Sequence, residues 1–105
     1  MTQPLWEPET IGVTIAIGNS DDKLTQFEWS EFCETLRTGF PYLHVFGVWY
    51  SAPDSRYQNM CVSALIEAEY LDSLRLWLTD MAGVWWQDSI AITIGKAEFI
   101  EAKKP

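Results

Sequence analysis

Between residues 10 and 18, apolar residues alternate with small or polar ones. The apolar positions are Ile11, Val13, Ile15 and Ile17. This period of two is typical of a strand with one buried face. From Trp29 onward the apolar residues recur at helical spacing instead, which predicts a helix over residues 26–38.

The polar stretch between this strand and this helix carries the signals of a helix start. Thr25 and Glu28 have the spacing of a capping box, in which each side chain accepts a hydrogen bond from the other's backbone N–H. Leu24 and Trp29 hold the positions of the hydrophobic staple that accompanies the box. We therefore expect a fixed strand–loop–helix corner, and Gly39 suits the C′ position after the helix.

The rest of the chain repeats extended and helical patterns. Periodicity and β-propensity predict strands at residues 42–50, 60–67 and 90–94, and a helix at 69–82 that could continue to Trp86. Residues 51–59 have loop chemistry, so the strands on either side of them are expected to form a hairpin. Residues 1–10 predict an extended lead-in and residues 101–105 a tail.

The predicted order is βαββαβ in a single domain. Right-handed crossovers and packing between sequence neighbours favour an antiparallel sheet in strand order 4-1-3-2, with both helices on one face. This is the ferredoxin-like α+β fold. The other face of the first and last strands is then flat and carries Gly12, Thr14, Ala16, Ala91 and Thr93. Such a face is either solvated or covered by a second copy of the chain, which would make a homodimer.

Composition indicates the size of the core and the cellular compartment that we expect for this domain. The chain has 105 residues, of which 48% are hydrophobic, so it can bury a modest core. No apolar run is long enough to cross a bilayer and no basic, apolar signal region follows Met1, so we expect a cytoplasmic protein. Cys33 and Cys61 are interpreted as buried thiols in a reducing compartment, with one disulfide as the alternative.

The formal net charge of −8 favours some classes of binding partner and disfavours others. A strongly negative chain repels phosphate backbones, and its basic residues are scattered, so direct nucleic-acid binding is disfavoured. The same charge permits binding to a basic protein surface or to a cation. We expect a protein partner and no membrane.

The predicted topology brings polar segments from distant parts of the chain to one end of the domain. The first strand, the second strand and the second helix all end there, and each is followed by a polar loop. The binding candidates are Asn19, Asp21, Asp22, Trp49, Asp54, Arg56, Tyr57, Asn59, Trp86, Gln87 and Asp88. Exposed Trp and Tyr rings beside arginine and carboxamide groups suit a protein interface or stacking on a planar ligand.

The polar residues at this end bear on several more specific chemistries. Residues 22–28 resemble the second half of a calcium loop, but Ile17 and Asp22 replace its acidic first ligand and its glycine, which excludes an EF-hand. The loop aspartates could hold a hard divalent cation, or could simply be turn residues. Nucleophilic catalysis would have to use His44, which lies in a predicted strand away from the polar loops.

Two groups with the ferredoxin-like fold invite comparison. The end of the first strand is similar to that of small nucleases of this fold, which keep an aspartate where Asn19 or Asp21 stands here. The basic and aromatic strand signature of RNA-recognition motifs is absent from residues 60–67.

The sequence favours a non-enzymatic module that binds a protein partner through its polar, aromatic-rich end and needs no cofactor. One concrete version is an inhibitor of a basic, nucleic-acid-handling protein, of the kind that phages use as antagonists. The alternative is a small-molecule or nucleotide binder, or a carboxylate-metal enzyme, that uses the same loops.

Overall fold

The computed structural model describes residues 9–52 and 54–103. The elements follow in the order β1 (Thr10–Gly18), α1 (Gln26–Thr38), β2 (His44–Tyr50), β3 (Asn59–Glu67), α2 (Leu71–Val84) and β4 (Ala91–Lys96). A short 3-10 turn, Ser20–Asp22, follows β1, and another, Ala68–Tyr70, precedes α2. Most of the expected lead-in, residues 1–8, lies outside the described residues.

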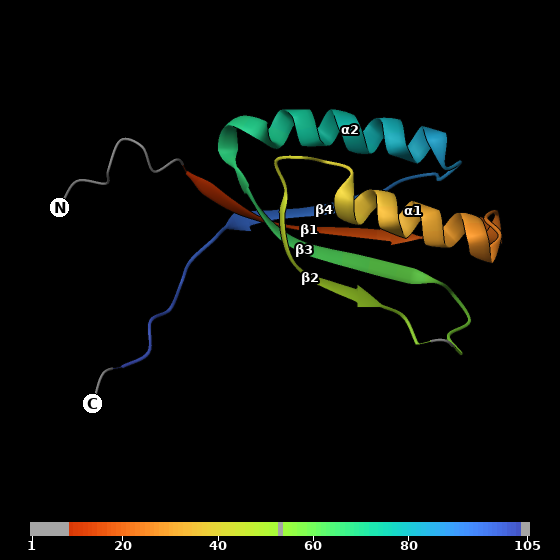
Figure 1. The fold of residues 1–105 in the computed structure, drawn as a ribbon, viewed down its shortest axis with the longest axis horizontal. Helices are drawn as coiled ribbons and strands as arrows, with labels where there is room; N and C mark the ends of the chain where they lie inside the picture. Colours follow the sequence, from red (N-terminus) through yellow and green to blue (C-terminus); the bar gives the residue numbers. More distant parts are fainter. Residues whose placement is uncertain (1–8, 53, 104–105) are drawn as a thin grey trace.

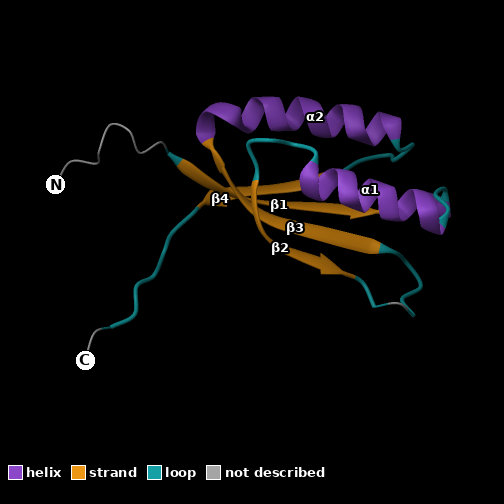
Figure 2. Cartoon of the chain, viewed as in Figure 1, coloured by secondary structure: helices purple, strands orange, loops and turns teal. Residues whose placement is uncertain are grey.

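The strands form one antiparallel sheet in the order β2-β3-β1-β4, which is the predicted 4-1-3-2 read from the other edge. Both helices lie on the same face of this sheet (Figures 1 and 2). The α+β ferredoxin-like fold is therefore confirmed. Within the described residues, neither helix has the length and apolar character that crossing a bilayer requires.

The core fills the space between the sheet and the two helices. Alternate residues of the central strands point into it, at Val13, Ile15, Ile17, Met60, Val62, Ala64 and Ile66. Phe32 of α1 is fully buried, and its ring stacks on Trp85 with 5.5 Å between centroids. This contact fixes the end of α2 against α1, so the segment that follows α2 starts from a rigid point.

The start of α1 is as predicted. The Thr25 N–H donates to Glu28 Oε1 at 2.9 Å and the Glu28 N–H donates to Thr25 Oγ1 at 3.2 Å, which completes the capping box. Leu24 and Trp29 are both buried in the core, as the hydrophobic staple requires. The corner is thus fixed at both of its ends.

The boundaries of the later elements differ by a few residues from the predicted ones. β2 begins at His44 rather than at residue 42, because Tyr42 lies in a turn in which the Leu43 N–H donates to the Phe40 carbonyl at 3.3 Å. The Tyr42 ring stacks on Tyr70, with 3.9 Å between the ring centroids. α2 begins after the 3-10 turn and ends at Val84. β4 continues to Lys96 because it pairs with β1 as far as Ile11.

The sheet face away from the helices carries the small residues that were predicted for β1 and β4, and larger ones on β2. Trp49 pairs with Cys61 there, on the side opposite the buried Met60 and Val62. Both cysteines are free, but only Cys33 is buried, and Cys61 is half-buried on this open face. The expectation of two buried thiols is therefore wrong for Cys61, since its strand position alternates with the core positions.

Candidate functional site

Three polar segments meet at one end of the domain, as the topology predicted (Figure 1). They are the corner at residues 19–25, the β2–β3 loop at 51–58, and residues 85–90 between α2 and β4. We call these residues the polar end. Hydrogen bonds between the segments hold them in one arrangement, together with the packing of Leu24 and Trp85 on the core.

Asn19 joins the corner to the β2–β3 loop. Its Oδ1 accepts from the Leu24 N–H at 2.9 Å, and its Nδ2 donates to the Leu24 carbonyl at 3.0 Å and to Gln58 Oε1 at 2.9 Å. The Asn19 N–H also donates to the Gln58 carbonyl at 3.1 Å. Gln58 in turn donates to Gln26 Oε1 at 3.0 Å, which extends the network to the first turn of α1. The Asn19 side chain is thus committed to holding the loops.

Gln87 and Lys23 join the corner to the segment after α2. Gln87 is only 8% exposed, and its Oε1 accepts from the Ser20 N–H at 2.8 Å while its Nε2 donates to the Trp85 carbonyl at 2.9 Å. Lys23 Nζ lies 3.2 Å from the Trp86 carbonyl and 3.3 Å from Asp88 Oδ1. The ion pair is exposed and contributes little, so Gln87 is the stronger connection.

The backbone is strained at three residues of this end. Asp21, Asp22 and Trp86 have φ angles of 52°, 56° and 54°, in the left-handed region that favours glycine. Aspartate tolerates this region, but for a bulky residue such as tryptophan it is an outlier. Such strain costs roughly 1–3 kcal/mol per residue and is concentrated at binding and active sites. The Trp86 ring is 60% exposed, so core packing does not explain its presence.

A polar groove runs between the corner and the β2–β3 loop. Its volume is about 460 Å³, and the Trp29 and Tyr50 rings contribute to its walls beside Asp22, Arg56 and Gln58. A second hollow of about 290 Å³ adjoins it and shares Asp22, Arg56 and Gln58. Arg56 stands between the two, with its guanidinium 5.4 Å from the centroid of the Tyr57 ring. The groove therefore combines aromatic surface with groups of both charges.

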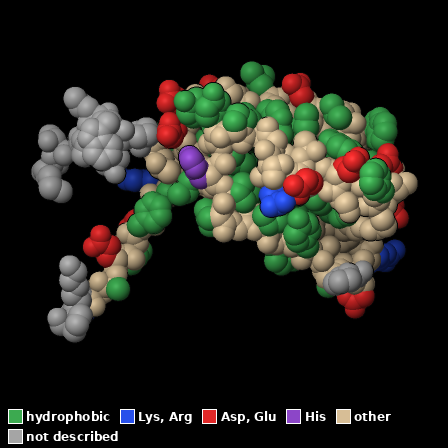
Figure 3. Space-filling model, viewed as in Figure 1, with side chains coloured by type: hydrophobic (Ala, Val, Ile, Leu, Met, Phe, Trp, Pro, Cys, Tyr) green, Lys and Arg blue, Asp and Glu red, His purple; other side chains and the backbone are tan. Residues whose placement is uncertain are grey.

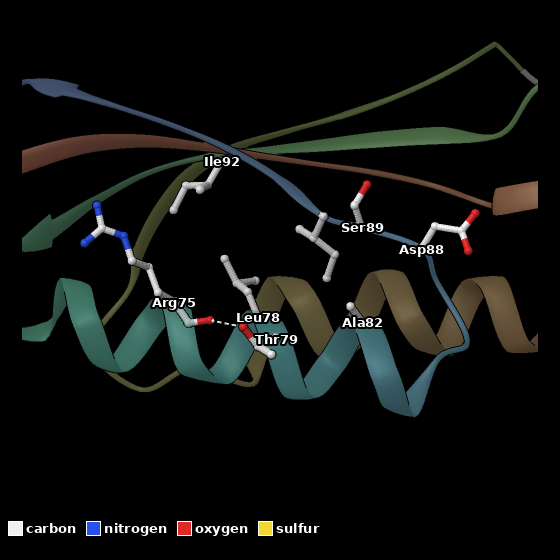
Figure 4. A pocket seen from close by; sticks show the side chains of 8 residues that line it. Arg75, Leu78, Thr79, Ala82, Asp88, Ser89 and Ile92 are labelled. Atoms are coloured by element: carbon white, nitrogen blue, oxygen red, sulfur yellow. Dashed lines mark hydrogen bonds between the residues drawn. The ribbon is translucent and has the colours of Figure 1, made fainter.

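Another hollow begins at the polar end and follows the side of the domain between α2 and β4 (Figure 4). It has a volume of about 470 Å³. Arg75 stands near one end and Asp88 and Ser89 at the other, with Leu78 and Ile92 between them. The surface available to a partner at Asp88 thus continues beyond the loops.

Acidic side chains lie at the polar end as well as elsewhere on the surface (Figure 3). Asp21, Asp22, Asp54 and Asp88 are all exposed. Within residues 9–52 and 54–103, no three histidine, cysteine or carboxylate side chains lie close enough together to hold a metal ion. Burial raises the pKa of the Cys33 thiol to about 11, and this residue lies in the core, away from the polar end.

The structure brings together most of the predicted site residues, in different roles. Asn19, Asp21, Asp22, Arg56 and Tyr57 line one hollow, and Asn59 lines the adjoining groove. Asn19 and Gln87 also connect the loops to one another through hydrogen bonds. Asp54 lies in the turn of the β2–β3 loop and lines neither hollow, and Trp49 lies on the open sheet face.

Gln26, Gln58 and Lys23 belong to the site and were not among the predicted residues. Gln26 and Gln58 connect α1 to the hairpin loop, and Lys23 connects the corner to the end of α2. Glutamine and lysine occur in no recognisable motif here, so only the positions of the loops reveal their partners. In comparisons with known proteins, the chain matches no protein-family model and no curated protein.

Proposed function

We propose that this domain is a protein-binding module whose contact surface is the polar end. The observation that carries the proposal is the exposed Trp86 ring, which stands on a strained backbone at a point held by Gln87 and Lys23. An exposed tryptophan at a left-handed φ contributes nothing to the core. Its retention has a physical reason if the ring inserts into a partner.

The surrounding residues have the chemistry of an interface centre. Interface energy concentrates in tryptophan, tyrosine and arginine, and Trp86, Tyr57 and Arg56 are all exposed here. The hydrogen bonds of Asn19, Gln58 and Gln87 order the loops before binding. A pre-ordered surface loses less conformational entropy when a partner binds, so more of the contact energy appears as affinity.

Charge supports a partner with a basic surface. The exposed aspartates of the polar end add to a net charge of −8, which accelerates encounter with positive surfaces and disfavours acidic ones. A domain of this kind could occupy the surface with which a basic protein binds nucleic acid. An inhibitor of such a protein, of the phage antagonist type, is the specific form of the proposal.

The groove between the corner and the β2–β3 loop favours one second candidate. At about 460 Å³ it could take a small planar molecule, with the Trp29 and Tyr50 rings beside it and Arg56 available for an anionic group. A small-molecule or nucleotide binder would use this groove rather than Trp86. The carboxylate-metal alternative has no comparable observation in its favour.

Matched variants separate these candidates. The chain is immobilised and exposed to lysate, as wild type and as Trp86→Gly, Arg56→Ala and Leu76→Ala. Leu76 is 69% exposed on α2 and serves as the control for loss of an exposed apolar side chain. Glycine relieves the strain at residue 86, so Trp86→Gly is expected to fold at least as well as the wild type.

The expected result is a protein retained by the wild type and by Leu76→Ala and lost from Trp86→Gly and Arg56→Ala. Thermal melts with nucleotides and with Mg²⁺, Mn²⁺ or Ca²⁺ run in parallel. A nucleotide-induced rise in Tm that Arg56→Ala abolishes and Trp86→Gly keeps would replace the protein-binding proposal by the groove binder. Equal retention by all four chains would show that the polar end is not the interface.

A further inference from the structure

The open face of the sheet has a bulky edge and a small edge. On β2, Phe46 is 71% exposed and Trp49 is 58% exposed. Phe46 stands at the β-bulge between Val45 and Gly47, where β2 carries one extra residue against β3. On the opposite edge strand, β4, the residues that share this face are Ala91, Thr93 and Gly95. The β2 edge of this face therefore protrudes, and the β4 edge is low.

The centre of the same face carries no charged side chain. Its residues on β1 and β3 there are Thr14, Ala16, Cys61 and Ser63, all uncharged, although the chain carries a net charge of −8. Among the described residues of this face, carboxylates lie only at the margin, at Glu67 and Glu98, so two copies can bring the centres of these faces together without bringing carboxylates into contact. A basic partner would gain nothing from the centre of this face, because it offers no opposite charge.

We propose that two copies of the chain pack their open faces together about a two-fold axis that runs along the strands. Sheets that pack face to face lie about 10 Å apart and nearly aligned. A rotation about this axis exchanges the two edges of the sheet, so β2 of each copy lies over β4 of the other. The bulky edge of each copy then packs against the small edge of the other copy.

The strand register identifies which residues meet. One row across the sheet runs Trp49, Cys61, Ala16, Ala91, and the rotation places Trp49 over the partner's Ala91. The next row on this face runs from Gly47 to Thr93, so Phe46 and Gly47 lie over the partner's Thr93. An axis across the strands would instead stack β2 on β2 and leave a void between the small residues of β4, at a cost in packing.

The C-terminal segment adds to an area that the sheet alone leaves below that of a standard interface. Four strands about 4.8 Å apart and about 3.3 Å per residue long give a plan area of roughly 500 Å², against about 800 Å² per partner in a standard interface. Ala97 and Phe99 line a hollow of about 380 Å³ together with Phe46 and Leu65 of the open face. Phe99 and Ile100 are 75% and 82% exposed, so they extend the apolar surface beyond the sheet.

This arrangement has a consequence for the polar end. A rotation about an axis parallel to the strands leaves the strand direction unchanged, so both polar ends lie at the same end of the dimer. The dimer then presents two equal binding surfaces side by side, which suits a partner that is itself two-fold symmetric or that repeats its binding site.

Sedimentation equilibrium over a wide range of concentration tests the dimer. The wild type is expected to sediment as a dimer, and Thr14→Lys, which buries a charge at the centre of the face, is expected to weaken dimerisation at least tenfold. Leu76→Lys makes the same charge change on exposed α2 and is expected to leave the dimer intact. Circular dichroism and thermal melts establish that both variants fold. A wild-type chain that remains monomeric at the highest concentration would overturn the proposal.

Disulfide trapping tests the axis. In a Cys61→Ser background, a Gly47→Cys chain is mixed with a Thr93→Cys chain and oxidised with glutathione disulfide. A Cβ at Gly47 would have only an ordinary contact, 3.9 Å to Ser63, so this variant is expected to fold. Within one chain β2 and β4 are about 14 Å apart, too far for a disulfide.

The expected result is a linked dimer in the mixture and none from either chain alone. Linkage in the Thr93→Cys chain alone would place β4 against β4 and overturn the proposed axis. A mixture that stays unlinked while the chains sediment as dimers would overturn it as well.

Discussion

Gln87 Oε1 accepts a hydrogen bond from the Ser20 N–H at 2.8 Å, across 67 positions of sequence. The two residues follow α2 and β1, which end side by side only because the fold runs them in the same direction. Ser20 opens the turn that leads into the strained Asp21 and Asp22, and Gln87 follows the strained Trp86. One buried contact therefore stabilises two of the three segments of the polar end.

Gln87→Met tests this contact. Methionine has a similar length but cannot accept from the Ser20 N–H or donate to the Trp85 carbonyl. We expect the free energy of unfolding, from urea melts, to fall by about 1–3 kcal/mol, because a buried donor loses its partner. Gln26→Met is the matched control, since Gln26 is exposed, and a loss below about 0.5 kcal/mol is expected there. If both variants lose the same free energy of unfolding, the loss comes from replacing a glutamine at any position and not from the contact with Ser20.

The fold was predictable because local signals agreed with one topology. The alternation in β1 and the capping box at Thr25 each fix a boundary without any distant contact. The strand order then follows from the handedness of crossovers. The start of β2 was predicted two residues early, because aromatic residues such as Tyr42 favour strands, whereas the structure places Tyr42 in a turn closed by the Leu43 N–H and the Phe40 carbonyl.

The location of the candidate site could be predicted from the sequence, but the contacts that its individual side chains make could not. Topology alone brings Asp21, Arg56 and Trp86 to one end. Whether a polar side chain there also holds another loop depends on side-chain geometry, so the loop-connecting hydrogen bonds of Asn19 and Gln87 could not be read from the sequence. Trp49 lies on the open face because it pairs with Cys61, whereas its neighbour Tyr50 pairs with the buried Met60, and this register is not evident from the sequence.

Thr25→Ala is expected to lower the free energy of unfolding by about 1 kcal/mol, because α1 loses the acceptor for the Glu28 N–H. Thr25→Ser keeps that hydroxyl and is expected to behave as the wild type does. Urea melts of the three proteins measure the difference. A Thr25→Ala variant as stable as the wild type would mean that Glu28 and water satisfy the helix start without the cap.

Gly39→Ala tests whether glycine is needed at the end of α1 for steric reasons rather than for a positive φ. Gly39 has a φ of −80° at the C-cap of α1, which any residue can adopt, so the reason for glycine is steric. A Cβ there would lie 2.6 Å from the Thr35 carbonyl oxygen and 2.8 Å from the Trp77 ring. We expect a loss of about 1–3 kcal/mol from overpacking. Gly83→Ala in α2, where a Cβ meets nothing within 4 Å, is the control and is expected to be neutral or stabilising.

The pKa of Cys33 makes stability fall at alkaline pH. Burial raises this pKa from 9.0 to about 11 in the folded chain. Between these values the unfolded chain releases the thiol proton while the folded chain keeps it, so the unfolded state binds fewer protons. The contribution is therefore complete below pH 9 and is lost as the pH rises towards 11. Cys33 is 3% exposed, so the thiolate is excluded by the core itself.

Urea melts at pH 8 and pH 10.5 measure this effect by difference. Cys33→Ala keeps every other titrating group, so its loss of stability between the two pH values should be smaller than that of the wild type, by an amount of order 1 kcal/mol. Val62→Ala, which also truncates a buried side chain but removes no titrating group, is the control and should lose as much between the two pH values as the wild type does. If Cys33→Ala and the wild type lose the same amount, the thiol of Cys33 ionises in the folded chain as readily as in the unfolded one, and the core around Phe32 and Leu36 admits water.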